Sequence, residues 1–316
     1  MANQDKFVIV QDMPDQVKLN YLRVMVDFVR SSHSDVDADH LAELQILMSQ
    51  LNFSPKLRQE IRSYLQTAML PLDAVLSGLD SNVPTGSEEV LHISLIKDLI
   101  RFLRIRNKQV EIADDFIHKV ADIYDINSKQ IAVLKQACIN DEEIMAGKVD
   151  DDMITRNAKD LAAKAAAVGV PVAAVYLSGS VVGLSAAGIT SGLAALGLGG
   201  ILGLSAMVTG IGIVVLIGVA SYTGVRWITG GSKREKVTKR EFLIQEIIKL
   251  NQKAISNLVE DINYFGGKIV ELTRSDEINR SMIEKLASEL TLFSKAVDSL
   301  QTRGVKLEKV SVREKG

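Results

Sequence analysis

The chain has 316 residues, enough for about two soluble domains or for one domain joined to a membrane unit. Residues up to 164 carry 19 Lys and Arg against 26 Asp and Glu, whereas the remainder carries 18 against 13. The acidic first half argues against a nucleic-acid binder, which needs a basic face. The single cysteine, Cys138, excludes an internal disulfide framework, and the 5 prolines and 5% aromatic residues favour helices.

Residues 1–145 are predicted to form an all-helical domain. Apolar residues recur with helical spacing in two series, which predict helices over 17–31, 37–51, 56–66 and 71–79, and then over 91–105, 112–124 and 129–139. Ser54-Pro55 and Asn127-Ser128 are typical of helix N-termini. The N-terminus shows no basic and apolar signal sequence, so we expect this domain to stay in the cytosol.

Part of this region resembles the TerB-like domain of tellurite-resistance proteins. The similarity lies in residues 26–30, 33–39 and 51–55, where a helix, an acidic turn and the motif Leu-x-hydrophobe-Ser-Pro follow one another. Residues 99–103 through Asn127-Ser128 correspond to the second half of that domain. The resemblance implies a helical fold of about 120 residues and, from the family's acidic cluster, a divalent cation site.

The acidic turn contains the weak metal candidates Asp35, Asp37 and Asp39. They match the first ligand positions of an EF-hand loop, but His40 stands where the loop needs glycine and Ile46 where it needs glutamate. The second turn, 107–111, is basic where the TerB-like pattern has acids. We therefore expect acids that favour a helix N-terminus, and no metal or other cofactor.

The stretch from Ala165 to Val225 is the most unusual feature of the sequence. Its 61 residues include 13 glycines and no Asp, Glu, Lys, Arg or His. A membrane-spanning helix needs about 20 apolar residues, so the stretch is long enough for two or three crossings. The first predicted span covers 168–182, a Gly-rich middle covers 183–203, and the strongest span covers 204–225.

Basic residues flank this stretch on both sides. The leading flank contains Lys148, Arg156, Lys159 and Lys164, and the trailing flank contains Arg226, Lys233, Arg234, Lys236, Lys239 and Arg240. The positive-inside rule places both flanks in the cytosol, which requires an even number of crossings. Lys164, Tyr222, Arg226 and Trp227 are the expected membrane-interface residues.

The glycines are spaced for close helix contact. Three Gly-x-x-x-Gly pairs occur, which are Gly179 with Gly183, Gly188 with Gly192, and Gly199 with Gly203. Packing of a hairpin and the lining of a narrow pore both remain open. Residues 170–172, 183–192 and 194–195 are similar to the small interferon-inducible hydrophobic family, and this resemblance implies membrane residence and a link to cell-death or defence responses.

The C-terminal region is predicted to form a coiled coil. Apolar residues step by four and three from Ile244 to Leu272 and again from Ile283 to Leu300. Asn251 occupies one apolar position and is expected to fix register or oligomer state. A turn at 274–277 would instead fold the two arms back into an antiparallel pair.

The predicted organisation is a helical domain over 1–145, a linker over 146–164, a transmembrane hairpin over 165–228, a coiled coil or helical hairpin over 229–303, and a tail over 304–316. No catalytic constellation occurs, so we expect a non-enzyme. The favoured function is a membrane-resident effector in the inner or plasma membrane, with both termini cytosolic. It would form homo-oligomers and recruit a protein partner through residues 1–145.

Two alternatives stay open. One is a soluble pore-forming toxin of the haemolysin E class, which conceals an apolar hairpin until it meets a membrane. The other is a membrane adaptor that makes no pore. Solubility without detergent distinguishes the toxin, and conductance distinguishes the adaptor.

Overall fold

The computed structural model describes residues 8–32, 36–105, 114–171, 174–175, 239–274 and 280–312. These residues are helical or connect helices and include no β-strand, which confirms the prediction of an all-helical fold. None of the helices in these ranges combines the length and apolar character needed to cross a membrane. Residues 176–228 of the predicted hairpin lie outside the described ranges.

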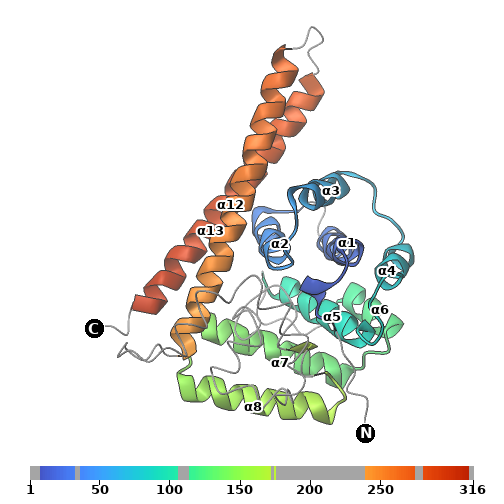
Figure 1. Cartoon of the computed structure of the whole chain (residues 1–316), viewed down its shortest axis with the longest axis vertical. Coiled ribbons are helices and arrows are strands. Elements are labelled where there is room, and N and C mark those ends of the chain that lie inside the picture. Colours follow the sequence, from blue (N-terminus) through green and yellow to red (C-terminus); the bar gives the residue numbers. More distant parts are fainter. Residues whose placement is uncertain are drawn as a thin grey trace.

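A helical body forms from the first part of the chain (Figure 1). After a short 3-10 turn over Val10–Asp12, its helices are α1 (Asp15–Ser32), α2 (Ala38–Gln50), α3 (Pro55–Gln66), α4 (Leu72–Asp80), α5 (Glu88–Arg104), α6 (Asp115–Ile123), α7 (Ser128–Met145) and α8 (Asp151–Ala167). Helix α1 lies between α2, α3, α4 and α5. Tyr21, Leu22 and Met25 on α1 are fully buried, as expected for a helix that is apolar around most of its circumference.

Local sequence sets where these helices begin and end. The side chains of Asp37, Ser54 and Asn127 accept hydrogen bonds from the first-turn amides of α2, α3 and α7, and Gln130 completes a capping box at α7. Helix α7 ends at Met145 and is followed by Gly147, whose φ of 67° favours glycine, and the Lys148 amide bonds back to the Glu143 carbonyl.

Most of the segment predicted as a linker, 146–164, is instead the packed helix α8. Ile154, Ala158 and Leu161 recur at helical spacing and are buried against the body. The acids that suggested a polar linker begin the helix, because Asp150 caps it and Asp151 and Asp152 lie in its first turn.

The C-terminal region folds back on itself as two long helices, α12 (Lys239–Arg274) and α13 (Arg280–Val312). They form an antiparallel hairpin along one side of the body, and its far end extends beyond α3 (Figure 1). The rings of Phe265 and Phe293 meet edge to face with centroids 4.9 Å apart. Of the two arrangements that the heptad pattern allowed, the structure has the antiparallel one.

Asn251 lies buried in the seam of this hairpin. Its side-chain amide donates to the Leu300 carbonyl at 2.8 Å, and no hydrogen bond reaches its side-chain oxygen. A Cβ on Gly304 would lie 3.2 Å from the Asn251 amide nitrogen, so the glycine makes room for this bond. Asn251 therefore links α12 to α13 within one chain.

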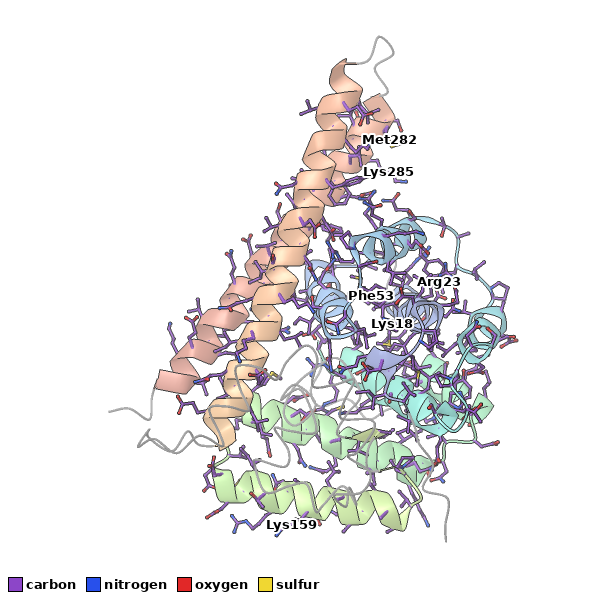
Figure 2. The ribbon with its side chains drawn as sticks, viewed as in Figure 1. Lys18, Arg23, Phe53, Lys159, Met282 and Lys285 are labelled. Atoms are coloured by element: carbon purple, nitrogen blue, oxygen red, sulfur yellow. The ribbon has the colours of Figure 1, made fainter. Side chains whose placement is uncertain are left out.

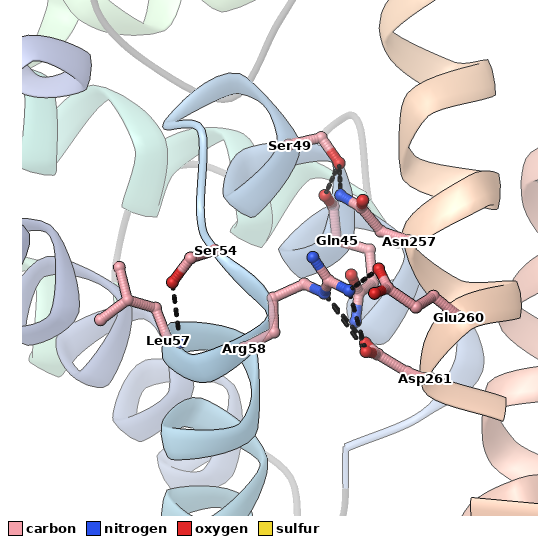
Figure 3. A network of polar contacts seen from close by, with 8 residues as sticks. All are labelled: Gln45, Ser49, Ser54, Leu57, Arg58, Asn257, Glu260 and Asp261. Atoms are coloured by element: carbon pink, nitrogen blue, oxygen red, sulfur yellow. Dashed lines mark hydrogen bonds and ion pairs between the residues drawn. The ribbon is translucent and has the colours of Figure 1, made fainter. Parts of the chain in front are cut away.

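Polar contacts hold the hairpin to α2 and α3 (Figure 3). The buried Arg58 side chain donates to Asp261, with 3.2 Å between Nε and Oδ1, and also to Glu260. One helical turn away, the Asn257 amide donates to Ser49 Oγ at 2.9 Å. These bonds position the middle of α12 on the body.

A second contact lies nearer the base of the hairpin. Glu43 on α2 is buried and pairs with Arg101 of α5 at 3.0 Å and with Arg303 of α13. Burial alone would raise the pKa of Glu43, but the Arg303 and Arg101 guanidinium groups outweigh it and lower the pKa to about 2. The carboxylate therefore joins the body to the hairpin as a charged group.

Replacing Glu43 with Gln removes the carboxylate that Arg101 and Arg303 share. We expect the free energy of unfolding to fall by about 3 kcal/mol, because breaking a buried ion pair leaves desolvated charge behind. Glu260→Gln, at the exposed partner of Arg58, is the control and should change it by less than about 1 kcal/mol. Thermal unfolding of the full chain in detergent, followed by circular dichroism, measures both; equal losses would contradict this ranking.

Candidate functional site at the start of the apolar segment

The first residues of the apolar stretch lie inside the helical body. Helix α8 ends at Ala167 and is followed by Gly169, whose φ is 74°, and the Val170 amide bonds back to the Ala165 carbonyl at 2.9 Å. Pro171 follows, and its carbonyl accepts from the Ala174 amide at 2.9 Å. This turn brings the chain back across the body.

Val170, Ala174 and Val175 are at most 2% exposed and belong to the same hydrophobic core as α1 and α5. The sequence predicts a membrane span over 168–182, but the structure places the first part of that range in the core. The difference has a simple cause, because a soluble core and a bilayer both favour apolar residues and hydropathy does not separate them.

A buried lysine holds the end of this turn. Lys97 on α5 is 4% exposed, and its Nζ donates to the Val175 carbonyl at 2.6 Å. A charge-assisted bond of this kind is stronger than one between neutral groups. Lys97 therefore fixes the backbone at the last described residue before the rest of the apolar stretch.

The carboxyl group of Asp141 on α7 lies nearby, with its Oδ2 3.9 Å from Lys97 Nζ. Burial raises the pKa of Asp141 to about 7, although Lys97 and Arg101 both lower it. A cavity of about 20 Å³ borders Asp141, Asn157 and Val175, which is room for about one water molecule.

The polar side chains around Lys97 also have partners within the body. Tyr21 donates to the buried carboxylate of Asp98 at 2.7 Å, and Cys138 Sγ lies 3.6 Å from the Lys97 carbonyl. Burial raises the pKa of Cys138 to about 12, so its thiol stays protonated and packs as a small apolar side chain. The site is built to hold a chain segment in place.

The first turns of α12, which follow the apolar stretch and its basic flank, pack on the same body. Leu243, in the first turns of α12, is fully buried in the core cluster that contains Val175. Helix α12 also contacts α7 and α8 (Figure 1). Val175 and Leu243 therefore belong to one folded body.

The structure describes only some of the residues that the sequence suggested for the membrane interface and the metal site. Lys164 is exposed on α8 and pairs with Asp160 at 2.6 Å, and Lys159 also points outward from α8 (Figure 2). The other sequence-predicted residues lie outside the described ranges. They are the interface residues Tyr222, Arg226 and Trp227, the metal candidate Asp35, and the paired glycines Gly179, Gly183, Gly188, Gly192, Gly199 and Gly203.

The two acids of the turn that the structure describes act separately. Asp37 accepts from the His40 amide at the start of α2, and Asp39 accepts from Ser299 of α13 at 2.8 Å. Within the described ranges, no three His, Cys, Asp or Glu side chains gather in a way that would hold a metal ion.

Sequence reasoning missed Lys97 and Asp141. The available signal was the pair Lys97-Asp98, which interrupts an apolar run between Leu95 and Ile100 on one helix. Charged residues at core positions of a helix are rare unless they are paired, so this interruption marked a buried polar contact. The contact partner, a backbone carbonyl 78 residues away, leaves no trace in a side-chain pattern.

Comparison of the chain with protein-family models, curated proteins and solved structures finds no match to any of them.

Replacing Lys97 with Met keeps most of the apolar bulk and removes the donor to Val175. Loss of a hydrogen bond to a charged group changes stability by about 1.5–3 kcal/mol, so we expect the amides of Ala174 and Val175 to exchange with solvent about 10- to 100-fold faster. Lys129→Met, at an exposed position of α7, is the matched control. Hydrogen–deuterium exchange measures both, and unchanged exchange at these two amides would show that Lys97 does not hold the segment.

Proposed function

We propose that this protein is a membrane-resident, non-enzymatic effector whose helical body carries an apolar hairpin through the inner or plasma membrane. The body and both termini would lie in the cytosol, where the body senses a signal or recruits a protein partner. Oligomers of the hairpin would perturb the membrane in a stress or defence response. The resemblances to the TerB-like domain and to the small interferon-inducible family support this proposal.

The observation that carries the proposal is the shared core of Val175 and Leu243. One folded body cannot lie on both sides of a bilayer, so the chain that leaves it after Val175 must return to the same side. An inserted segment between these residues therefore crosses an even number of times. This argument is independent of the basic flanks, which favour the same topology.

Length and composition support two crossings. The 61-residue stretch without Asp, Glu, Lys, Arg or His exceeds what two helices of about 20 residues need, even after its first residues are assigned to the body. The Gly-x-x-x-Gly pairs suit close contact between such helices and between neighbouring copies. Absence of Asp, Glu, Lys, Arg and His from the stretch favours packing and membrane perturbation over selective ion transport.

One observation favours the concealed hairpin of a soluble toxin. Val170, Ala174 and Val175 lie in the body's core, and the Lys97 bond holds them there. If the rest of the stretch were also sheltered by protein, the chain would remain soluble until it met a target membrane. This second candidate shares the all-helical architecture and differs in when insertion occurs.

Dye release from liposomes tests the proposal. We expect the full chain, reconstituted from detergent, to resist alkaline carbonate extraction and to release an entrapped dye. Gly188→Leu with Gly192→Leu would block close helix approach, so this variant should insert equally well and release dye only at the background rate. Ala163→Leu, on the exposed side of α8, is the control substitution.

The other outcomes separate the alternatives. Carbonate-resistant insertion without dye release would identify the non-permeating adaptor and contradict the effector. Purification without detergent, followed by release when the protein is added to preformed liposomes, would identify the toxin.

A further inference from the structure

Asp141 carries a largely buried carboxyl group that no hydrogen bond reaches from the described part of the chain. Its side chain is 14% exposed, and Lys97 Nζ lies 3.9 Å from its Oδ2, which is beyond hydrogen-bond distance. Buried polar groups are nearly always hydrogen-bonded, and an exception needs an explanation. The packing of α7 does not supply one, since an apolar side chain would avoid the cost of burying an acid.

The titratable groups around Asp141 come from α5 and α7, which pack against each other (Figure 1). They are Lys97, Asp98 and Arg101 on α5, and Cys138 and Glu142 on α7. Three of them have partners closer than 3.9 Å, because Asp98 accepts from Tyr21, Arg101 pairs with Glu43, and Glu142 pairs with Arg104. The residues that α8 contributes to the cavity beside Asp141 do not titrate; they are Ile154, Asn157, Ala158 and Leu161.

The turn at the start of the apolar stretch covers Asp141. Val175 is 1% exposed and lines the same cavity of about 20 Å³ as Asp141. Lys97 joins the two, because its Nζ donates to the Val175 carbonyl at 2.6 Å and lies 3.9 Å from the Asp141 carboxyl group. One ammonium group therefore lies between a neutral backbone acceptor and an acid, and withdrawal of Val175 would remove one wall of the cavity.

The protonation of Asp141 is linked to this cover. Burial raises the pKa of Asp141 from 3.8 to about 7, against the lowering effect of Lys97 and Arg101. When the turn opens, water reaches the carboxyl group and its pKa falls toward the ordinary value. The closed turn therefore binds the proton more tightly than the open turn. Protons stabilise the closed turn, and this stabilisation is lost as the pH rises toward 7.

Ionised Asp141 also competes for Lys97. A hydrogen bond between an ammonium group and a carboxylate is about 2.8 Å long, so a shift of about 1 Å would close the pair. A carboxylate is a stronger acceptor than a neutral carbonyl, and the adjacent cavity has room for about one water molecule that could solvate the charge. Ionisation therefore weakens the hold of Lys97 on Val175.

We propose that Asp141 is a proton-dependent latch for the start of the apolar stretch. When Asp141 is protonated, Lys97 holds the Val175 carbonyl and the turn stays in the core. When Asp141 is ionised, its carboxylate takes up water and competes for Lys97, and the turn opens more often. The latch is tight in acid and loosens toward neutral pH. It is a property of the helical body and goes beyond the proposed function.

Hydrogen–deuterium exchange of the full chain in detergent, measured from pH 5 to pH 8, tests the latch. The amides of Ala174 and Val175 both bond to the Pro171 carbonyl and report the opening of the turn. Their protection is the measured exchange rate relative to the intrinsic rate at the same pH. Linkage to one proton changes protection by up to about tenfold per pH unit. We expect a fall of at least about tenfold between pH 5 and pH 7, and little change above that.

Asp141→Asn keeps the shape of the side chain and removes its titration. Protection of Ala174 and Val175 in this variant should be the same at pH 5 and pH 7. Asp160→Asn is the matched control, because Asp160 lies on the exposed side of α8 and pairs with Lys164. This control should keep the pH dependence of the wild type. Circular dichroism at each pH establishes that the helical content is constant.

Three results would overturn the proposal. The first is protection in the wild type that does not fall between pH 5 and pH 7, which decides the matter even if Asp141→Asn fails to fold. The second is an equal pH dependence in Asp141→Asn. The third is exchange of Val175 at the same rate as the buried Leu22 on α1, since the turn would then open only when the whole body unfolds.

These readouts do not depend on membrane activity. A pH-dependent turn together with a failed dye-release experiment would reject the effector and keep the latch. Dye release from a chain whose turn does not respond to pH would do the reverse.

Discussion

The rest of the structure depends on one constraint, which is that the start of the apolar stretch and the start of α12 belong to a single hydrophobic core. Val175 packs in this core and its carbonyl accepts a hydrogen bond from Lys97, and Leu243 packs in the same core from α12. The two residues that bracket the intervening segment, Val175 and Leu243, are therefore held by the same body. Helix α8 supports this arrangement because it packs on α7 and is followed by the turn at Gly169. The C-terminal hairpin supports it because the start of α12 packs on the body.

The Lys97 contact also makes the junction costly to open. Lys97 is buried in the folded body, and withdrawal of the Val175 carbonyl would remove a charge-assisted hydrogen bond from it. Such a loss amounts to about 1.5–3 kcal/mol, in addition to the exposure of Val170, Ala174 and Val175. If the remaining stretch enters a bilayer as we propose, the cost of opening the junction favours insertion with the junction intact.

The elements that sequence reasoning found are those with local signals. Apolar periodicity located α1 to α7, and Ser54-Pro55 and Asn127 marked two helix starts. Helix caps and apolar helix faces depend on residues that are close together in the sequence. The packed role of α8 escaped, since the acids of its first turn suggested a linker. Lys97, Asp141 and Glu43 escaped because their partners lie far away in sequence, and the heptads of the hairpin fitted either an open coiled coil or the fold-back that the structure has.

The central claim is that one body holds both flanks of a two-span hairpin on the same side of a membrane. Side-specific labelling of single cysteines in sealed vesicles tests it most directly, with Lys164→Cys in the leading flank, Lys233→Cys in the trailing flank and Gly192→Cys in the Gly-rich middle. The account predicts that a membrane-impermeant maleimide reaches the two flanks from the cytosolic face and reaches position 192 only from the opposite face. Labelling of positions 164 and 233 from opposite faces would contradict it.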